Sequence, residues 1–219
     1  MKKIRYADDN DCRKINWQGI IQSIQPRTRV WRYLVDNRTH YYIGYNIFLL
    51  GKSDVDLTEF SVAISEKQQQ KYNFQIGDSI KGTAWTKMYP KREFADFYRA
   101  GSFRILERNH RLIESTAPWI GVVPTMDVLD ERGGRMLSKS RWKRKCFPCY
   151  YASMANVEII WDFDKDIKRY RFESFCYGPK SCKYFDPGPA RSVPYKGMGS
   201  VLDTGWLDKM YTRSRDEDE

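Results

Sequence analysis

The chain has 219 residues, of which 38 are Lys or Arg, 28 are Asp or Glu and two are His, so its formal net charge is +10. Of these residues 41% are hydrophobic and 15% aromatic, and a chain of this length buries roughly 70% of its unfolded surface, which excludes a wholly disordered protein. No apolar run approaches the roughly 20 residues of a membrane-spanning helix, and the basic start lacks the apolar stretch of a secretion signal, so we expect a cytoplasmic protein with no membrane partner.

The positive charge points to partners that are polyanions. Lys and Arg side chains attract a phosphate backbone and release its counterions, and nucleic acid is the commonest partner of this kind. An excess of this size also serves simply to keep a protein soluble, so the distribution of the charges has to decide between the two readings.

Residues 1–110 are predicted to form a β-barrel domain. Segments rich in β-branched and aromatic residues, typical of strands, occupy residues 17–24, 30–35, 41–50, 60–64, 79–85 and 101–106. Pro26 is expected to end the first of them, and Asp36, Asn37 and Arg38 have the composition of a turn. The polar segment 65–72 is predicted to be a short helix or an irregular connection.

The order of these segments resembles that of an OB-fold. About five strands in roughly 95 residues, with a connection of helix length before a Gly-Asp turn, match this small Greek-key barrel. Residues 74–82 carry an apolar, Gly-Asp, apolar, Gly pattern around Gly77 and Asp78 that recurs in such barrels. A different small barrel or half-sandwich is the alternative.

Residues 111–145 are predicted to be a linker or a small hairpin around Gly133 and Gly134. This segment ends in the densest charge feature of the chain, which contains seven cations and no acidic residue: Arg132, Arg135, Lys139, Arg141, Lys143, Arg144 and Lys145. So many uncompensated cations are costly to bring together unless an anion binds them.

Four of the five cysteines form two pairs in the final third of the chain. Two residues separate Cys146 from Cys149, and five separate Cys176 from Cys182, whereas Cys12 stands alone. In a chain without a secretion signal, such pairs indicate a metal site before they indicate disulfides. Between the pairs, apolar residues alternate on both sides of a polar turn at residues 164–168, which predicts a β-hairpin that brings Cys176 near Cys149.

This arrangement resembles a zinc ribbon, in which two cysteine turns joined by a hairpin hold one Zn²⁺. The resemblance covers residues 146–182 and implies a structural site, because four thiolates leave no open position for an activated water. The second pair departs from the pattern, since ribbons usually have about two residues between these ligands. Cys182 is therefore the least certain ligand, and an iron–sulfur cluster or buried unligated cysteines are the alternatives.

The sequence thus predicts a mainly β protein, an OB-like barrel followed by a zinc-ribbon hairpin with an irregular Pro/Gly-rich extension. Residues 146–210 form the ribbon domain in this interpretation, and residues 211–219 a disordered acidic tail. We expect it to bind single-stranded or structured RNA or DNA with little sequence specificity. The candidate contacts are the seven cations together with Arg32 and three aromatic residues that could stack on bases: Trp31, Tyr33 and Trp85.

Two other classes of function are compatible with parts of the sequence. One is a protein-interaction adaptor or an assembly subunit of a larger complex, whose basic run binds an acidic partner. Families that pair a zinc ribbon with an OB-fold also partner thiolase-type enzymes, but there the ribbon usually precedes the barrel. The other is an enzyme. The chain has only two histidines, no Gly-rich phosphate loop and no Ser/His/Asp spacing, and these features argue against the common catalytic chemistries.

Overall fold

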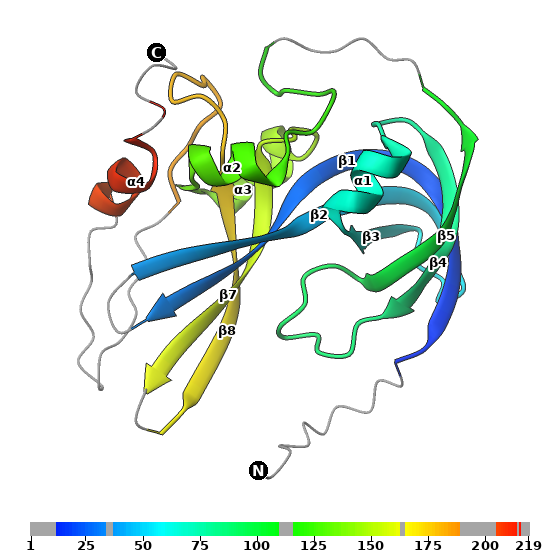
Figure 1. Ribbon diagram of the computed structural model, residues 1–219, viewed down its shortest axis with the longest axis horizontal. Helices are drawn as coiled ribbons and strands as arrows, with labels where there is room; N and C mark the ends of the chain where they lie inside the picture. Colours follow the sequence, from blue (N-terminus) through cyan, green and yellow to red (C-terminus); the bar gives the residue numbers. More distant parts are fainter. Residues whose placement is uncertain are drawn as a thin grey trace.

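The computed structural model describes residues 12–33, 37–109, 116–162, 165–188, 205–213 and 215. It is mainly β, with short helices between the strands (Figure 1). In chain order the elements are β1 (Lys14–Tyr33), β2 (Asn37–Ser53), β3 (Glu59–Ile64), α1 (Glu66–Tyr72), β4 (Ser79–Thr86), β5 (Phe97–Glu107), α2 (Met126–Arg132), β6 (Arg135–Leu137), α3 (Lys139–Arg141), the π-helical turn η1 (Trp142–Cys146), β7 (Ala152–Asp162), β8 (Ile167–Cys176) and α4 (Gly205–Tyr211).

Five strands close into a ring. β1 pairs with β2 on one side and with β4 on the other, β2 pairs with β3, and β4 pairs with β5, all antiparallel. A parallel contact between Val62 of β3 and Phe97 of β5 closes the ring. The strand and helix segments predicted between residues 41 and 107 are confirmed, with longer strands than expected at β2 and β5.

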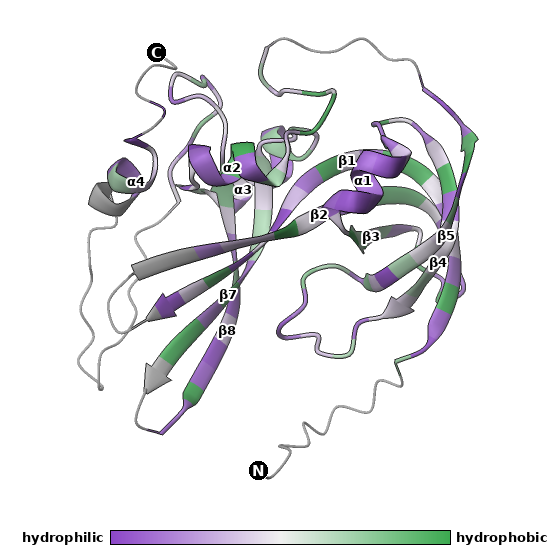
Figure 2. Cartoon of the chain, in the orientation of Figure 1, coloured by the Kyte–Doolittle hydropathy of each residue, from purple (hydrophilic) through white to green (hydrophobic). Residues whose placement is uncertain are grey.

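The interior of the ring is filled by aromatic and branched side chains. Trp17 packs edge-on against Phe60 and Phe103, at ring-centroid distances of 6.3 and 5.9 Å. Helix α1 begins with a capping box in which Ser65 and Gln68 satisfy each other's backbone N–H groups. Its surface is hydrophilic (Figure 2), so α1 presents little apolar area to solvent beside the ring.

The prediction that Pro26 ends the first strand is wrong, because β1 continues through it to Tyr33. The register with β2 shifts on either side of this region, between Ile21 and Ser23 and between Pro26 and Thr28. Proline, which has no N–H to donate, is tolerated at such an irregularity. Beyond it, β1 leaves β4 and pairs in parallel with β7, from Arg29 to Tyr33.

The hairpin predicted between the cysteine pairs is confirmed as β7 and β8. Residues 163 and 164 at its tip lie outside the described residues. The segment 111–145 was predicted to be a linker or a small hairpin, but its described part forms other structure: α2 ends at Gly133, and β6 joins the sheet beside β8. The difference arises from tertiary structure. β6 forms backbone hydrogen bonds with β8, which begins thirty residues after β6 ends, and local sequence does not reveal this pairing.

The tail predicted to be disordered from residue 211 begins with packed residues. Helix α4 reaches Tyr211, and Arg215 is buried and donates to the carbonyl of Gly178. That hydrogen bond satisfies a carbonyl in the loop between Cys176 and Cys182, which explains why this end of the chain packs. Among the described residues, no helix is long and apolar enough to span a membrane.

A buried ion pair joins the ring to the hairpin. Arg32 of β1 and Glu173 of β8 are both fully buried, and the guanidinium and carboxylate lie 2.5 Å apart. Arg171 donates to the same carboxylate. Burial alone raises the pKa of Glu173, but the two guanidinium groups outweigh it and hold the pKa below its usual range.

Replacing Glu173 with Gln should destabilise the protein by about 3–5 kcal/mol at pH 7, because the Arg32 charge stays buried without its strongest partner. Urea denaturation measures this loss. The double variant Arg32→Met, Glu173→Leu should recover much of it, since neither charge then remains inside. Equal midpoints for wild type and Glu173→Gln would contradict the role assigned to this pair.

The stability difference between wild type and Glu173→Gln should also depend on pH. The pKa of Glu173 is lower in the folded chain than in the unfolded chain, where it is about 4.3. Its contribution is therefore present above that pH and lost as the pH falls through the folded value, so the stability gap between wild type and Glu173→Gln should shrink in acid.

Candidate metal centre and nucleic-acid interface

The first cysteine pair lies on a tight turn that follows η1. Cys146 is the last residue of η1, and its carbonyl accepts a hydrogen bond of 3.0 Å from the N–H of Cys149. The carbonyl of Cys149 in turn accepts from Ala152, the first residue of β7, at 3.1 Å. This turn places both thiols at the start of the hairpin.

The second pair lies at the other end of the hairpin. Cys176 is the last residue of β8, where Ala152 of β7 and Arg135 of β6 are its neighbours across the sheet. The chain then loops back, and the N–H of Cys182 donates to the carbonyl of Pro179 at 3.3 Å. The wider spacing of this pair is thus accommodated by a turn at residues 179–182.

All four cysteines line one small enclosed cavity. Its volume is about 10 Å³, far below the roughly 300 Å³ of a site for a small organic ligand. The walls are otherwise apolar and aromatic, and they include Trp119, Leu137 and Phe185. A cavity of this size has room for a single ion or water and for no organic cofactor.

The four side chains are chemically suited to a soft metal ion, although they are not gathered around one point. All four are free thiols. Within the described residues, no group of three or more His, Cys, Asp or Glu is arranged to hold a metal ion. Burial raises the pKa of Cys146 and of Cys149 to about 12. In this arrangement they are neutral thiols that pack as small apolar groups, and ligation would require their deprotonation.

Two of the predicted phosphate contacts, Arg132 and Arg135, support the second cysteine loop. Arg132 donates to the carbonyl of Tyr177 at 2.6 Å. Arg135 donates to the carbonyls of Pro179 and Lys180, and its guanidinium lies 3.7 Å from the ring centroid of Phe185. These hydrogen bonds give both arginines a structural role in this loop, and their contact with phosphate stays a prediction.

The rest of the basic run forms an exposed helical surface, the basic turn, which comprises residues 139–145. Ser138 caps it by accepting from the N–H of Arg141 at 3.2 Å. Arg141 is half-buried and lies 3.8 Å from the carboxylate of Asp186, whereas four cations are exposed: Lys139, Lys143, Arg144 and Lys145. The turn ends directly at Cys146, so the cysteine cluster and the charges share one segment.

Trp142 and Phe147 attach the basic turn to the ring. The indole N–H of Trp142 donates to the buried side chain of Gln25 in β1 at 2.9 Å. The amide of Gln25 donates back to the carbonyl of Phe147 at 2.6 Å, and Ser23 donates to the same carbonyl. These bonds hold the turn against the outer face of β1.

Beside the basic turn lies a depression with a volume of about 400 Å³ on the outer face of β2 and β3, which we call the aromatic hollow. Three phenylalanines line it, namely Phe48 of β2, Phe94 and Phe147. The ring centroid of Phe48 lies 6.1 Å from that of Phe94 and 5.1 Å from that of Phe147. Its two acids are Glu59 and Asp96. Asp96 accepts from Ser61 at 2.9 Å and lies 3.3 Å from the ammonium of Lys87.

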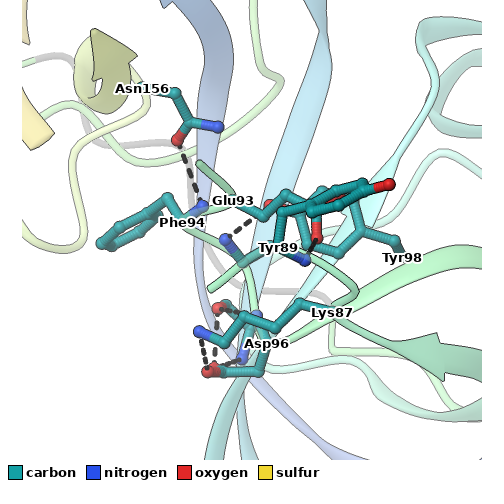
Figure 3. Close-up of polar contacts among 9 residues, drawn as sticks. Lys87, Tyr89, Glu93, Phe94, Asp96, Tyr98 and Asn156 are labelled. Atoms are coloured by element: carbon teal, nitrogen blue, oxygen red, sulfur yellow. Dashed lines mark hydrogen bonds and ion pairs between the residues drawn. The ribbon is translucent and has the colours of Figure 1, made fainter. Parts of the chain in front are cut away.

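The loop between β4 and β5 carries Phe94 into this hollow. Figure 3 shows the N–H of Phe94 donating to the side-chain oxygen of Asn156 in β7, at 3.1 Å, and Lys87 facing Asp96. The amide of Asn156 also donates to the carbonyl of Arg92. The hairpin thereby fixes the loop that supplies one wall of the hollow.

The remaining predicted contacts are spread over the molecule. Arg32 is buried in its ion pair, so its interpretation as a phosphate-binding residue is wrong. Trp31 is 40% exposed and packs against Tyr41, which is 44% exposed, at a centroid distance of 4.9 Å. Trp85 is half-buried on the outer side of β4, and the side chain of Tyr33 lies outside the described residues.

Sequence reasoning missed Phe94 and Phe147 as residues of the hollow. Phe94 lies in a loop with no periodic pattern, and Phe147 lies between two cysteines. One signal was available at Trp142, a large apolar residue inside a run of cations, which indicates that one face of that run is packed against something.

No protein-family model matches the chain, and no curated protein or solved structure is similar enough to it to place it beside a characterised protein.

Replacing Arg135 with Lys should destabilise the protein by about 1–2 kcal/mol, since Lys keeps the charge but cannot donate to two carbonyls while lying flat on a ring. Thermal and urea denaturation report this loss, and limited proteolysis should show faster cleavage in residues 177–182. Lys143→Ala, on the exposed surface of the basic turn, is the control and should change stability by less than about 0.5 kcal/mol. Equal stability of Arg135→Lys and wild type would contradict the assignment.

Proposed function

We propose that this protein binds single-stranded RNA or DNA with little sequence specificity, on an OB-type barrel whose basic turn is held in place by a structural zinc site. The observation that carries the proposal is that four exposed cations lie on the segment whose Trp142 and Phe147 pack beside the aromatic hollow. The rings of the hollow are half-buried, and cations beside accessible aromatic faces are the combination that binds single strands, by phosphate attraction and base stacking.

Three features support the OB-type barrel. The ring order is β1-β2-β3-β5-β4, β3 and β5 are parallel, and α1 lies between β3 and β4. Barrels of this type bind oligonucleotides over the face of their second and third strands, between the loops that follow the first and fourth strands. The aromatic hollow lies on that face, and Phe94 comes from the second of those loops.

The chemistry of the cysteines supports zinc. Four thiols from two short turns are among the residues that line one small cavity, and a tetrahedral tetrathiolate needs these donors and no others. Zn²⁺ would have to draw the four sulfurs inward and displace their protons. It would stabilise the turn at Cys146–Cys149 and, through it, the orientation of the cations that precede it.

Replacing Cys149 with Ser should abolish binding of one zinc ion per chain and unfold the C-terminal third, because structural zinc contributes on the order of 10 kcal/mol to small sites. Elemental analysis of the purified protein and hydrogen exchange measure the two effects. Cys12→Ser is the matched control, because Cys12 donates to the carbonyl of Thr86 in the ring, apart from the cluster. Full zinc content in Cys149→Ser would overturn the ligand assignment, and visible absorbance with iron in the wild type would overturn zinc.

Replacing Lys139, Lys143, Arg144 and Lys145 with Ala should weaken binding to oligonucleotides of unrelated sequence to a similar extent. The slope of log affinity against log salt should become shallower by about 3, since each lost phosphate contact on a single strand contributes about 0.7. Fluorescence anisotropy with labelled 15-nucleotide strands at several salt concentrations measures both quantities. An unchanged slope would rule out the basic turn as a phosphate contact.

A further inference from the structure

A row of positively charged side chains crosses four neighbouring strands on the outer surface of the ring. The cross-strand neighbours of Gln18 in β1 are Lys52 of β2 and Lys81 of β4. The neighbour of Lys81 on its other side is Arg104 of β5. The sheet therefore places three cations and one amide in a single line across β2, β1, β4 and β5.

This row lies in a groove whose volume is about 560 Å³. Asn16, Thr83 and Ser102 also line it and supply amide and hydroxyl groups. The one acid among the described lining residues is Asp54, whose carboxylate oxygen already accepts from the backbone and the side chain of Asn16, at 2.7 and 2.9 Å. Most of the lining residues are polar, and three cations stand against one carboxylate, so the net charge of the lining is positive.

The cations of the row have no acidic partner among the residues that the structure describes. Lys52, Lys81 and Arg104 occur in none of its ion pairs. Lys81 and Arg104 face each other directly across two strands, where Cβ atoms are about 5 Å apart and like charges repel. A bound anion would remove this repulsion.

The groove and the aromatic hollow are separate depressions on the outer face of β1 and β2. Between them lie Ile20 and Leu50, cross-strand neighbours that are 47% and 48% exposed. Lys52 in the groove and Phe48 in the hollow are four residues apart on β2, about 14 Å along an extended strand. The outer face therefore presents cations, then an apolar pair, then aromatic rings, and then the cations of the basic turn.

We propose that the groove binds backbone phosphates of the same nucleic-acid strand whose bases pack over the aromatic hollow. This inference rests on the proposed function and extends it. It specifies that the nucleic acid runs along the outer face of β1 and β2. It also requires an oligonucleotide longer than the aromatic hollow alone would hold. The exposed apolar pair favours a nucleic acid over an acidic peptide, because it offers a surface for bases between two sets of phosphate contacts.

The test compares two triple variants that lose the same charge. Lys52→Ala, Lys81→Ala and Arg104→Ala remove the groove cations. Lys67→Ala, Lys71→Ala and Lys209→Ala remove exposed cations on α1 and α4, away from both the groove and the hollow. A third variant, Lys52→Arg, Lys81→Arg and Arg104→Lys, keeps every charge. Thermal denaturation confirms that each variant is folded.

Fluorescence anisotropy is measured with labelled strands of 15 and 4 nucleotides at several salt concentrations. For the 15-nucleotide strand we expect the groove variant to bind at least tenfold more weakly than the wild type in low salt, with a salt slope shallower by about 2. The matched triple variant and the charge-keeping variant should bind within about twofold of the wild type. The 4-nucleotide strand is too short to reach both the groove and the aromatic hollow, so its affinities for the groove variant and for the wild type should differ much less.

Each failure identifies a different error. If the wild type binds strands and the groove variant behaves like the matched variant, the groove inference is wrong and the proposed function stands. If the wild type binds no nucleic acid, both are wrong. If a nucleoside monophosphate or inorganic phosphate competes at the groove as well as the 15-nucleotide strand does, the groove is a phosphate-monoester site, and equal competition by polyglutamate makes it an acidic-protein site; either result overturns the assignment to a strand.

Discussion

Strand β1 is the constraint on which the rest of the structure depends, because it belongs to two parts of the sheet at once. Its first half pairs with β2 and β4 within the ring, and its second half pairs with β2 and with β7, the first strand of the hairpin between the cysteine pairs. Between the halves the register shifts near Pro26, and beyond them the buried pair of Arg32 and Glu173 joins β1 to β8. The ring and the hairpin therefore share backbone hydrogen bonds and a buried charge, which couples their stabilities.

This coupling explains how the candidate site is assembled from distant segments. Gln25 and Ser23 of β1 hold Phe147, and Gln25 also holds Trp142, so the basic turn lies against the ring. Asn156 of β7 holds the loop that carries Phe94 into the same place. An aromatic hollow results that neither the ring nor the hairpin forms alone. The cysteine cluster lies immediately behind the basic turn, so a metal there would act on the interface through the backbone of a few residues.

The cations of the chain divide into two classes with different roles. Arg32 is buried and binds a carboxylate, whereas the half-buried Arg132 and Arg135 bind loop carbonyls through their planar guanidinium groups. Among the exposed cations, two groups lie on either side of the aromatic hollow, namely the basic turn and the row across β2, β1, β4 and β5. Net charge alone does not separate these classes, since an Arg contributes +1 whether it is buried or exposed.

The sequence by itself determined the mainly β character, most strand positions, the helix before β4, the hairpin between the cysteine pairs and the clustering of charge before Cys146. These features follow from alternation, turn residues and spacing, which act over a few residues along the chain. Only the tertiary structure decided that β1 runs through Pro26, that Arg32 is buried, that two arginines of the basic run bind loop carbonyls and that Phe94 joins Phe48. The reason is physical: the burial of a side chain and the partner of a donor depend on segments up to 141 residues away, such as β8 for Arg32, and local pattern carries no record of them.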